Sequence, residues 1–305
     1  MAIAELFSLQ AQLFLMILVG LWLKKKGIVD ESGKKCLTDL CVNVVIPCNI
    51  LKSFLIEFSW DIFTACSLIL LISAATQVAF VFLNRVLFNR YPPEQKKVLQ
   101  YCVICSNGGF LGNPVCEGIY GALGLLYASF YLIPMRIVIW STGLSYFTNT
   151  GSTSRKETIK KAITHPCLVS VYLGTLLMFT QAPLPAFLTE TIRSIGNCNS
   201  ALTMFIIGTI LADVDLRTIV NKDTLWFSLL RLVLLPGVVF IACRLIGLDN
   251  VATGVSVLLT GMPAGSTSAI FAARYHSDAP FATKCVVFTT LLSLVTLPIW
   301  CILCG

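Results

Sequence analysis

Apolar segments about as long as a bilayer is thick recur along this chain, and they restrict its fold more than any other feature. A helix rises about 1.5 Å per residue, so about 20 residues cross a hydrocarbon core of about 30 Å. Ten segments of this kind each predict a membrane-spanning helix: residues 6–23, 35–56, 62–83, 98–120, 123–147, 166–180, 185–212, 224–246, 251–273 and 279–303. We therefore expect an all-α integral membrane protein.

The composition supports a membrane setting. Only 12% of the 305 residues are charged, whereas soluble proteins usually carry about 25%. The net charge of +7 raises the possibility of nucleic-acid binding. We exclude that partner, because the basic residues lie in short turns between apolar spans and not on one polar face. The first span follows an acidic residue, Glu5, and precedes Lys24–Lys26, so it does not have the pattern of a cleaved signal peptide.

The thirteen cysteines do not indicate metal or redox chemistry. Most lie inside apolar spans, where cysteine packs as a small apolar residue. Cys102/Cys105 and Cys301/Cys304 are spaced to share a helix face, but no histidine or further cysteine cluster lies beside either pair. The spans contain no histidine. We therefore expect no catalytic residue, no metal site and no cofactor, and an intramembrane enzyme is the weakest of the functions considered.

A polar segment at 148–164 divides the ten spans into two groups of five, at residues 1–147 and 165–305. An odd number of spans in each half requires the second half to enter the membrane upside down relative to the first. This arrangement predicts two inverted five-helix repeats.

The basic residues predict the orientation. The loops after spans one, three, five, seven and nine, together with the starts of the spans that follow them, hold 17 of the 22 Lys and Arg residues. Positively charged loops stay in the cytoplasm. We therefore expect a multi-pass protein of the cell membrane with both termini outside and the 148–164 loop in the cytoplasm.

The fourth and ninth spans are predicted to be broken. The fourth contains Asn107-Gly108-Gly109-Phe110-Leu111-Gly112-Asn113-Pro114, and the ninth contains Met262-Pro263-Ala264-Gly265-Ser266-Thr267-Ser268. Glycine and proline at this density do not maintain a regular helix. We expect the first half-helix to end near Asn107-Gly108, the second to be capped by Asn113, and the ninth span to restart at Pro263.

Paired interruptions at the same place in two halves are typical of a transporter site. If the two spans cross, the positive N-terminal ends of their second halves favour an anion near the midplane. The alternative is a pair of proline kinks that only shape packing. The predicted crossover residues are Gly108, Gly112, Pro114, Pro263 and Gly265. The predicted substrate-binding residues are Asn107, Asn113, Arg136, Ser266, Thr267 and Ser268; the three hydroxyls are alternatively ligands of a coupling cation, Na⁺ or H⁺ being the candidates.

We include Arg136 among the predicted substrate-binding residues because it lies in the middle of the fifth span. An arginine there costs about 2.5–3.5 kcal/mol on insertion scales and must face protein or water. A structural bond to Glu117 is the alternative. Arg231 and Arg244 lie nearer span ends, and we expect both to extend to the membrane surface. For the polar residues of spans two and seven we expect helix–helix hydrogen bonds: Asn43, Asn49, Asn197, Asn199 and Ser200.

Three blocks of sequence resemble the auxin efflux carrier family, which includes bacterial organic-acid permeases and plant PIN-type carriers. They are Gly20-Leu-Trp-Leu-Lys-Lys-Lys-Gly-Ile-Val-Asp30 with Ile46-Pro47; Asn107–Pro114 with Ile119-Tyr120-Gly121; and Met262-Pro263 through Phe271-Ala-Ala-Arg-Tyr275, followed by Leu291–Pro298. Their order and spacing are more specific than any single block, and together they extend over nearly the whole chain.

The resemblance implies ten helices in two inverted repeats, with helices four and nine broken and crossing at Pro114 and Pro263. It also implies a homodimer, a scaffold of helices one, two, six and seven, and a transport domain that moves in an elevator-type alternating-access cycle. Asn107 matches an asparagine that helps to hold substrate. The third helix of PIN-type carriers has an acidic and a basic residue, whereas residues 73–77 here have neither.

The expected function is secondary transport of a small organic anion. The fixed charge of Arg136 stands where we expect a neutral polar residue in the plant carriers, which favours a carboxylate. The alternative is a channel or receptor-like sensor on the same fold.

Overall fold

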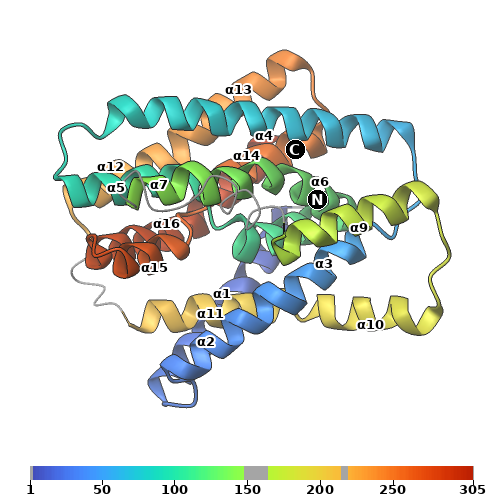
Figure 1. The fold of residues 1–305 in the computed structure, drawn as a ribbon, viewed down its shortest axis with the longest axis horizontal. Coiled ribbons are helices and arrows are strands. Elements are labelled where there is room, and N and C mark those ends of the chain that lie inside the picture. The colour runs from blue at the N-terminus through green and yellow to red at the C-terminus, as the bar shows by residue number, and fades with distance from the viewer. Residues whose placement is uncertain (1–2, 148–163, 214–218, 305) are drawn as a thin grey trace. The chain divides into compact units, whose positions relative to one another are not determined.

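The computed structural model describes residues 3–147, 164–213 and 219–304, and the described part is helical apart from one isolated β-bridge (Figure 1). The predicted 148–164 loop lies outside the described residues except for Thr164. Among the described residues, six helical segments are long and apolar enough to cross a membrane: Glu31–Ser53, Trp60–Leu87, Gly108–Phe147, Ala186–Ala212, Lys222–Ile246 and Ala279–Cys304. Pro166–Thr180 and Asn250–Thr260 are shorter apolar helices.

Each of the ten predicted spans has a helical counterpart. In chain order the α-helices are α1 (Ile3–Lys25), α2 (Glu31–Leu40), α3 (Ile46–Ser53), α4 (Trp60–Leu87), α5 (Pro93–Ile104), α6 (Asn113–Val138), α7 (Leu144–Phe147), α9 (Pro166–Thr180), α10 (Ala186–Asn197), α11 (Asn199–Ala212), α12 (Lys222–Leu229), α13 (Leu235–Ile246), α14 (Asn250–Thr260), α15 (Thr267–Arg274) and α16 (Ala279–Cys304). In the described part of the chain, four π-helical turns interrupt them: η1 (Cys41–Val45), η2 (Gly108–Gly112), η3 (Ile139–Gly143) and η5 (Leu230–Leu234).

The predicted turn between spans four and five lies at Gly121 within α6. Its φ of 65° and ψ of −152° are not helical, so α6 consists of two helices that meet at this residue. A positive φ is accessible to glycine without a steric penalty. The two parts of α6 therefore correspond to the end of the predicted fourth span and the start of the fifth.

The chain divides into two compact units, and each draws on both halves of the sequence. Unit 1 contains Met1–Ser67, Gly109–Phe130 and Thr164–Asp213; unit 2 contains Leu68–Gly108, Tyr131–Ile163 and Val214–Gly305. The helices of spans one, two, six and seven all belong to unit 1. Helices α4 and α6 each pass from one unit to the other.

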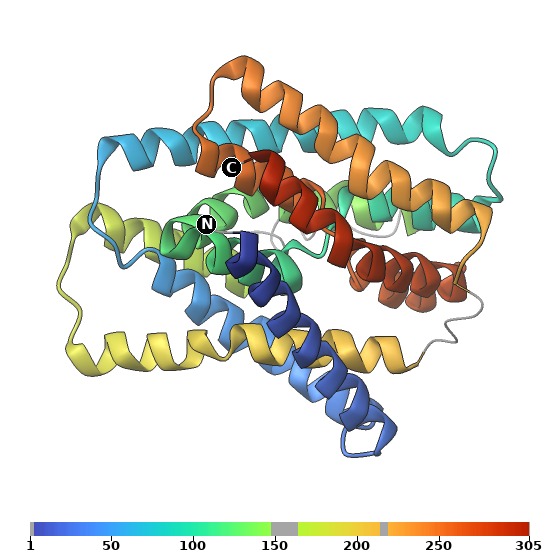
Figure 2. The ribbon, with the colours of Figure 1, turned by 180° about the vertical axis from the view of Figure 1, so that it is seen from behind.

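In unit 1, α1 packs closely on α11 (Figures 1 and 2). A Cβ atom built on Gly20 would lie 2.2 Å from the carbonyl oxygen of Phe205, and one on Gly208 would lie 2.1 Å from that of Ile17. Small residues let membrane helices approach backbone to backbone in this way. Helix α3 packs against both α9 and α10.

In unit 2, α16 packs against α5, α12, α14 and α15. Trp300 of α16 donates from Nε1 to the carbonyl oxygen of Leu232 at 2.8 Å. The ring of Phe271 on α15 lies 5.3 Å from that of Tyr101 on α5 and 5.7 Å from that of Trp140. These contacts hold the second half of the ninth span against α5.

Candidate functional site

Both predicted breaks are present. Helix α5 ends at Ile104, and the chain resumes as the π-helical turn η2 at Gly108. Helix α14 ends at Thr260, and α15 begins at Thr267. Non-helical backbone inside a membrane protein must find hydrogen-bond partners within the protein or in water.

The two breaks supply those partners to each other, within unit 2. Ser106 and Ala264 form an antiparallel β-bridge. The amide of Asn107 donates to the carbonyl oxygen of Pro263 at 2.8 Å, and the amide of Gly265 donates to that of Cys105 at 2.9 Å. Main-chain hydrogen bonds thus join the break in the fourth span, in the first half of the sequence, to the break in the ninth span, in the second half.

This pairing needs a residue without a side chain at Gly265. A Cβ atom there would lie 2.7 Å from Sγ of Cys105 and 3.3 Å from its carbonyl oxygen. The amide of Ala264 donates to Oγ1 of Thr289 on α16 at 3.1 Å. The break in the ninth span is therefore fixed on one side by α5 and on another by α16.

Arg231 holds both breaks, and our expectation that it extends to the membrane surface is wrong. Its side chain is 1% exposed. Nε donates to the carbonyl oxygen of Met262 at 3.0 Å, and Nη1 donates to that of Val103 at 2.8 Å. Arg231 lies seven residues into a predicted span, but it belongs to the π-helical turn η5, and its side chain points into the unit. Arg244, by contrast, is exposed and donates to Oδ1 of Asn250.

Asn107 lies within the paired breaks. The residue is 4% exposed, and among the described residues its side-chain amide has no hydrogen bond, although its main-chain amide is engaged. An amide group in this state can accept from and donate to a bound molecule.

The three predicted hydroxyls differ in their surroundings. Ser266 precedes α15, is partly exposed and makes no capping hydrogen bond. Oγ1 of Thr267 accepts from the Tyr101 hydroxyl at 3.2 Å and lies 3.2 Å from Sγ of Cys105. Ser268 is fully buried and donates to the carbonyl oxygen of Gly265 at 2.7 Å. Ser266 is therefore the most available of the three.

Arg136 lies on α6 beside the break in the fourth span. The adjacent Met135 accepts a hydrogen bond from Oγ of Ser106 at 3.2 Å, and Leu132, one turn earlier, lies close to Gly108. Arg136 is 8% exposed, and its buried Nη1 has no hydrogen-bond partner in the part of the chain that the structure describes. Glu117, the alternative partner, pairs instead with Lys52 at 2.5 Å.

Asn113, Gly112 and Pro114 belong to unit 1, whereas the other predicted site and crossover residues belong to unit 2. Asn113 is fully buried, and neither polar atom of its side chain has a hydrogen-bond partner among the described residues. It therefore does not cap a half-helix as expected; helical turns already begin at Gly108. The ninth span likewise restarts at Thr267 and not at Pro263.

Unit 1 has a polar cluster that the sequence did not reveal. Nζ of Lys52 contacts Oε1 of Glu117 and Oδ1 of Asn197, the latter at 3.0 Å. Asn49 and Asn199 are buried, and the polar atoms of both side chains lack partners. The helix–helix hydrogen bonds expected for these two residues are thus absent from the described part of the chain.

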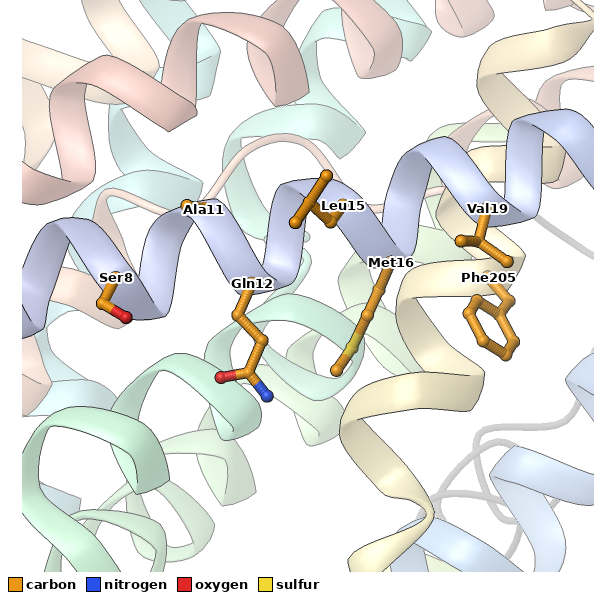
Figure 3. A pocket seen from close by; sticks show the side chains of 7 residues that line it. All are labelled: Ser8, Ala11, Gln12, Leu15, Met16, Val19 and Phe205. Carbon is orange, nitrogen blue, oxygen red and sulfur yellow. The ribbon is translucent and has the colours of Figure 1, made fainter.

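A groove of about 500 Å³ runs along α1 in unit 1 (Figure 3). Its lining comes from α1 and from one residue of α11: Ser8, Ala11, Gln12, Leu15, Met16, Val19 and Phe205. Leu15 is 61% exposed and Val19 is 43% exposed. Because none of the described lining residues is charged and none is a predicted site residue, we place the candidate site at the paired breaks and not in this groove.

Comparison with known proteins agrees with the resemblance seen in the sequence. The family described as "Membrane transport protein" matches residues 6–301. An uncharacterized transporter of Methanothermobacter thermautotrophicus is 28% identical over 93% of this chain and 94% of its own length. An uncharacterized transporter of Methanocaldococcus jannaschii is 23% identical over 94% of each chain. Auxin efflux carrier component 1 of Arabidopsis thaliana is 25% identical over 48% of this chain and 24% of its own length.

Proposed function

The chain belongs to this family of membrane transport proteins, which are transporters and not enzymes, and we propose that it carries a small organic anion, a carboxylate, across the cell membrane. The observation that carries the proposal is the main-chain pairing of the two breaks at Asn107–Pro263 and Cys105–Gly265. Substrate sites of secondary transporters lie where discontinuous helices meet.

The charge distribution favours an anion. Among the described residues, the only buried charged side chains are Arg136 and Arg231. Arg231 is engaged by two carbonyl oxygens, whereas Nη1 of Arg136 has no partner. A guanidinium binds a carboxylate through two parallel hydrogen bonds. In our proposal Arg136 binds the carboxylate, and Asn107, Ser266 and Thr267 bind the remainder of the substrate.

Asn113 and Ser268 have weaker support. Asn113 belongs to the other unit, and the hydroxyl of Ser268 already donates to Gly265. We retain both as proposed site residues on the sequence argument alone, and a ligand would have to displace the Ser268 hydrogen bond.

The division into units supports an elevator-type movement, which we propose on this basis. Unit 1 contains spans one, two, six and seven, which the family resemblance assigns to the scaffold. Unit 2 contains the paired breaks and would move with the substrate.

Two pairs of interruptions at matching positions support the proposed inverted repeats of five helices. Spans four and nine are both broken. Span two is interrupted at η1, and span seven at Cys198 between α10 and α11. We also propose, from the sequence, that both termini face outward, that the 148–164 loop is cytoplasmic and that the protein is a homodimer.

The test is binding and uptake by the purified full-length protein. Thermal unfolding in detergent, with a panel of mono- and dicarboxylates, should identify ligands that raise the unfolding temperature. Liposomes containing the protein should then take up those carboxylates with saturable kinetics under an appropriate ion gradient. Failure of every carboxylate in both assays would contradict the proposal, and flux that does not saturate would favour a channel.

A further inference from the structure

Arg231 binds at the ends of two half-helices, a place where other transporters with broken helices coordinate a cation. Its guanidinium contacts the carbonyl oxygen of Val103, in the last turn of α5, and that of Met262, just beyond the end of α14. Both accepting residues are fully buried. One side chain from a third span thus binds the C-terminal ends of the first halves of both broken spans.

These two ends are where a cation is favoured. The last four carbonyl groups of a helix have no partner within it, and the helix dipole places about half a negative charge there. In transporters with discontinuous helices, unwound carbonyls and half-helix C-termini coordinate the coupling cation. Two such ends together carry about one negative charge. A guanidinium, which stays protonated in proteins, balances that charge.

Several other polar groups close to these two ends are also engaged. The carbonyl oxygens of Cys105 and Pro263 accept from Gly265 and Asn107. The hydroxyls of Thr260 and Tyr131 lie 2.6 Å apart and bond to each other. Oγ1 of Thr289 accepts from Ala264. A metal ion at this place would compete with these hydrogen bonds and with the guanidinium of Arg231.

We propose that Arg231 is a built-in replacement for a coupling metal cation, so that no alkali cation binds between the ends of α5 and α14. Arg231 is therefore a positioning residue: it holds the breaks that carry the substrate groups without contacting the substrate. The transport part of this inference rests on the proposed function, whereas the cation-binding part does not.

The experiment compares wild type, Arg231→Ala, Arg231→Lys and the control Arg244→Ala as purified full-length proteins. Arg244 is a matched control because it lies in the same unit but is exposed. The unfolding temperature is measured in sodium, lithium, potassium and choline chloride at constant ionic strength, and with millimolar guanidinium. Uptake into liposomes is measured with sodium or choline on both sides.

The wild type and Arg244→Ala should unfold at the same temperature in every salt and transport equally in sodium and choline. Arg231→Ala should unfold at a lower temperature, and sodium or guanidinium should raise that temperature with a saturable concentration dependence. Its maximal uptake rate should fall more than its apparent affinity, and the same cations should partly restore the rate. Arg231→Lys keeps the charge, so it should be less stable than wild type but insensitive to sodium.

Saturable stabilisation of the wild type by sodium would overturn the inference, as would the same unfolding temperature of Arg231→Ala in all salts. If Arg231→Ala does not fold, a sodium response of either the wild type or Arg231→Lys overturns the inference, and insensitivity of both supports it. If the unfolding results hold but no carboxylate is transported, the proposed function fails and the assignment of Arg231 stands.

Discussion

The Nε atom of Arg231 donates to the carbonyl oxygen of Met262 at 3.0 Å, which joins the eighth span directly to the break in the ninth. Through Nη1 the same side chain also holds Val103, at the end of α5. The breaks in the fourth and ninth spans are therefore bound to each other and to the buried guanidinium group of Arg231.

Loss of the Arg231 guanidinium group should destabilise the protein. In Arg231→Gln, at least one of the carbonyl oxygens of Val103 and Met262 loses its partner, and each unpaired buried group costs about 1–3 kcal/mol. We expect a clearly lower unfolding temperature in detergent, with Arg244→Gln close to wild type because Arg244 is exposed. Equal unfolding temperatures for the two variants would show that the contacts of Arg231 contribute little to stability.

Gly265→Ala should disrupt the pairing of the breaks. The added Cβ would lie 2.7 Å from Sγ of Cys105, and overpacking of this kind typically costs about 1–3 kcal/mol. Gly109→Ala is the control, since among the described residues no atom beyond its chain neighbours lies within 4 Å of the position of its Cβ. We expect the first variant to lose uptake and the second to retain it. Normal uptake by Gly265→Ala would mean that close pairing is not required.

Asn107→Ala should abolish uptake while the protein remains folded in the membrane. The side chain of Asn107 has no partner among the described residues, so its removal breaks no internal hydrogen bond. Asn43→Ala, an exposed change on the other unit, should transport normally. Uptake at the wild-type rate by Asn107→Ala would exclude this residue from the site.

Arg136→Gln should bind carboxylates about 10- to 100-fold more weakly, because a hydrogen bond to a charged group contributes about 1.5–3 kcal/mol. Its stability without ligand should be preserved, since Nη1 of Arg136 has no partner to lose. Ligand titrations followed by thermal unfolding measure both quantities. A strongly destabilised variant would support a structural role, and a stable variant with wild-type affinity would eliminate Arg136 as a carboxylate ligand.

The predicted orientation can be tested at the C-terminus. The 17 basic residues in or next to alternate loops predict that Gly305 faces outward. A reporter that is active only in the cytoplasm should therefore stay silent when fused after Gly305. Strong reporter activity would show that the C-terminus faces the cytoplasm and that the predicted orientation is wrong.

Local sequence was sufficient to predict the helical segments. The sixth span was predicted at 166–180, and α9 has these bounds. The breaks at Asn107 and Pro263 and the turn at Gly121 were also predictable, because glycine and proline act on the main chain at their own positions. The half-helix starts were less accurate: the π-helical turn η2 begins before the proline, and the ninth span resumes after it.

The roles of individual polar residues were harder to predict, because they depend on contacts between segments far apart in the sequence. Arg231 and Val103 are 128 residues apart in the sequence. The position of Arg231 near the end of a span predicts that its side chain extends to the membrane surface, and this prediction is wrong. The Lys52–Glu117 pair joins residues 65 apart and removes the acid that we considered as a partner for Arg136. Neither contact has a signal in the local sequence.

Counterflow in liposomes tests the central claim most directly. Liposomes with wild-type protein are preloaded with an unlabelled carboxylate that stabilises the protein, and then diluted into trace labelled carboxylate. A carrier exchanges internal for external substrate, so labelled carboxylate should accumulate transiently above its equilibrium level, and Asn107→Ala should abolish this accumulation. Entry of label that never exceeds equilibrium and does not saturate, or no entry of any carboxylate, would contradict the assignment of this protein as an organic-anion carrier.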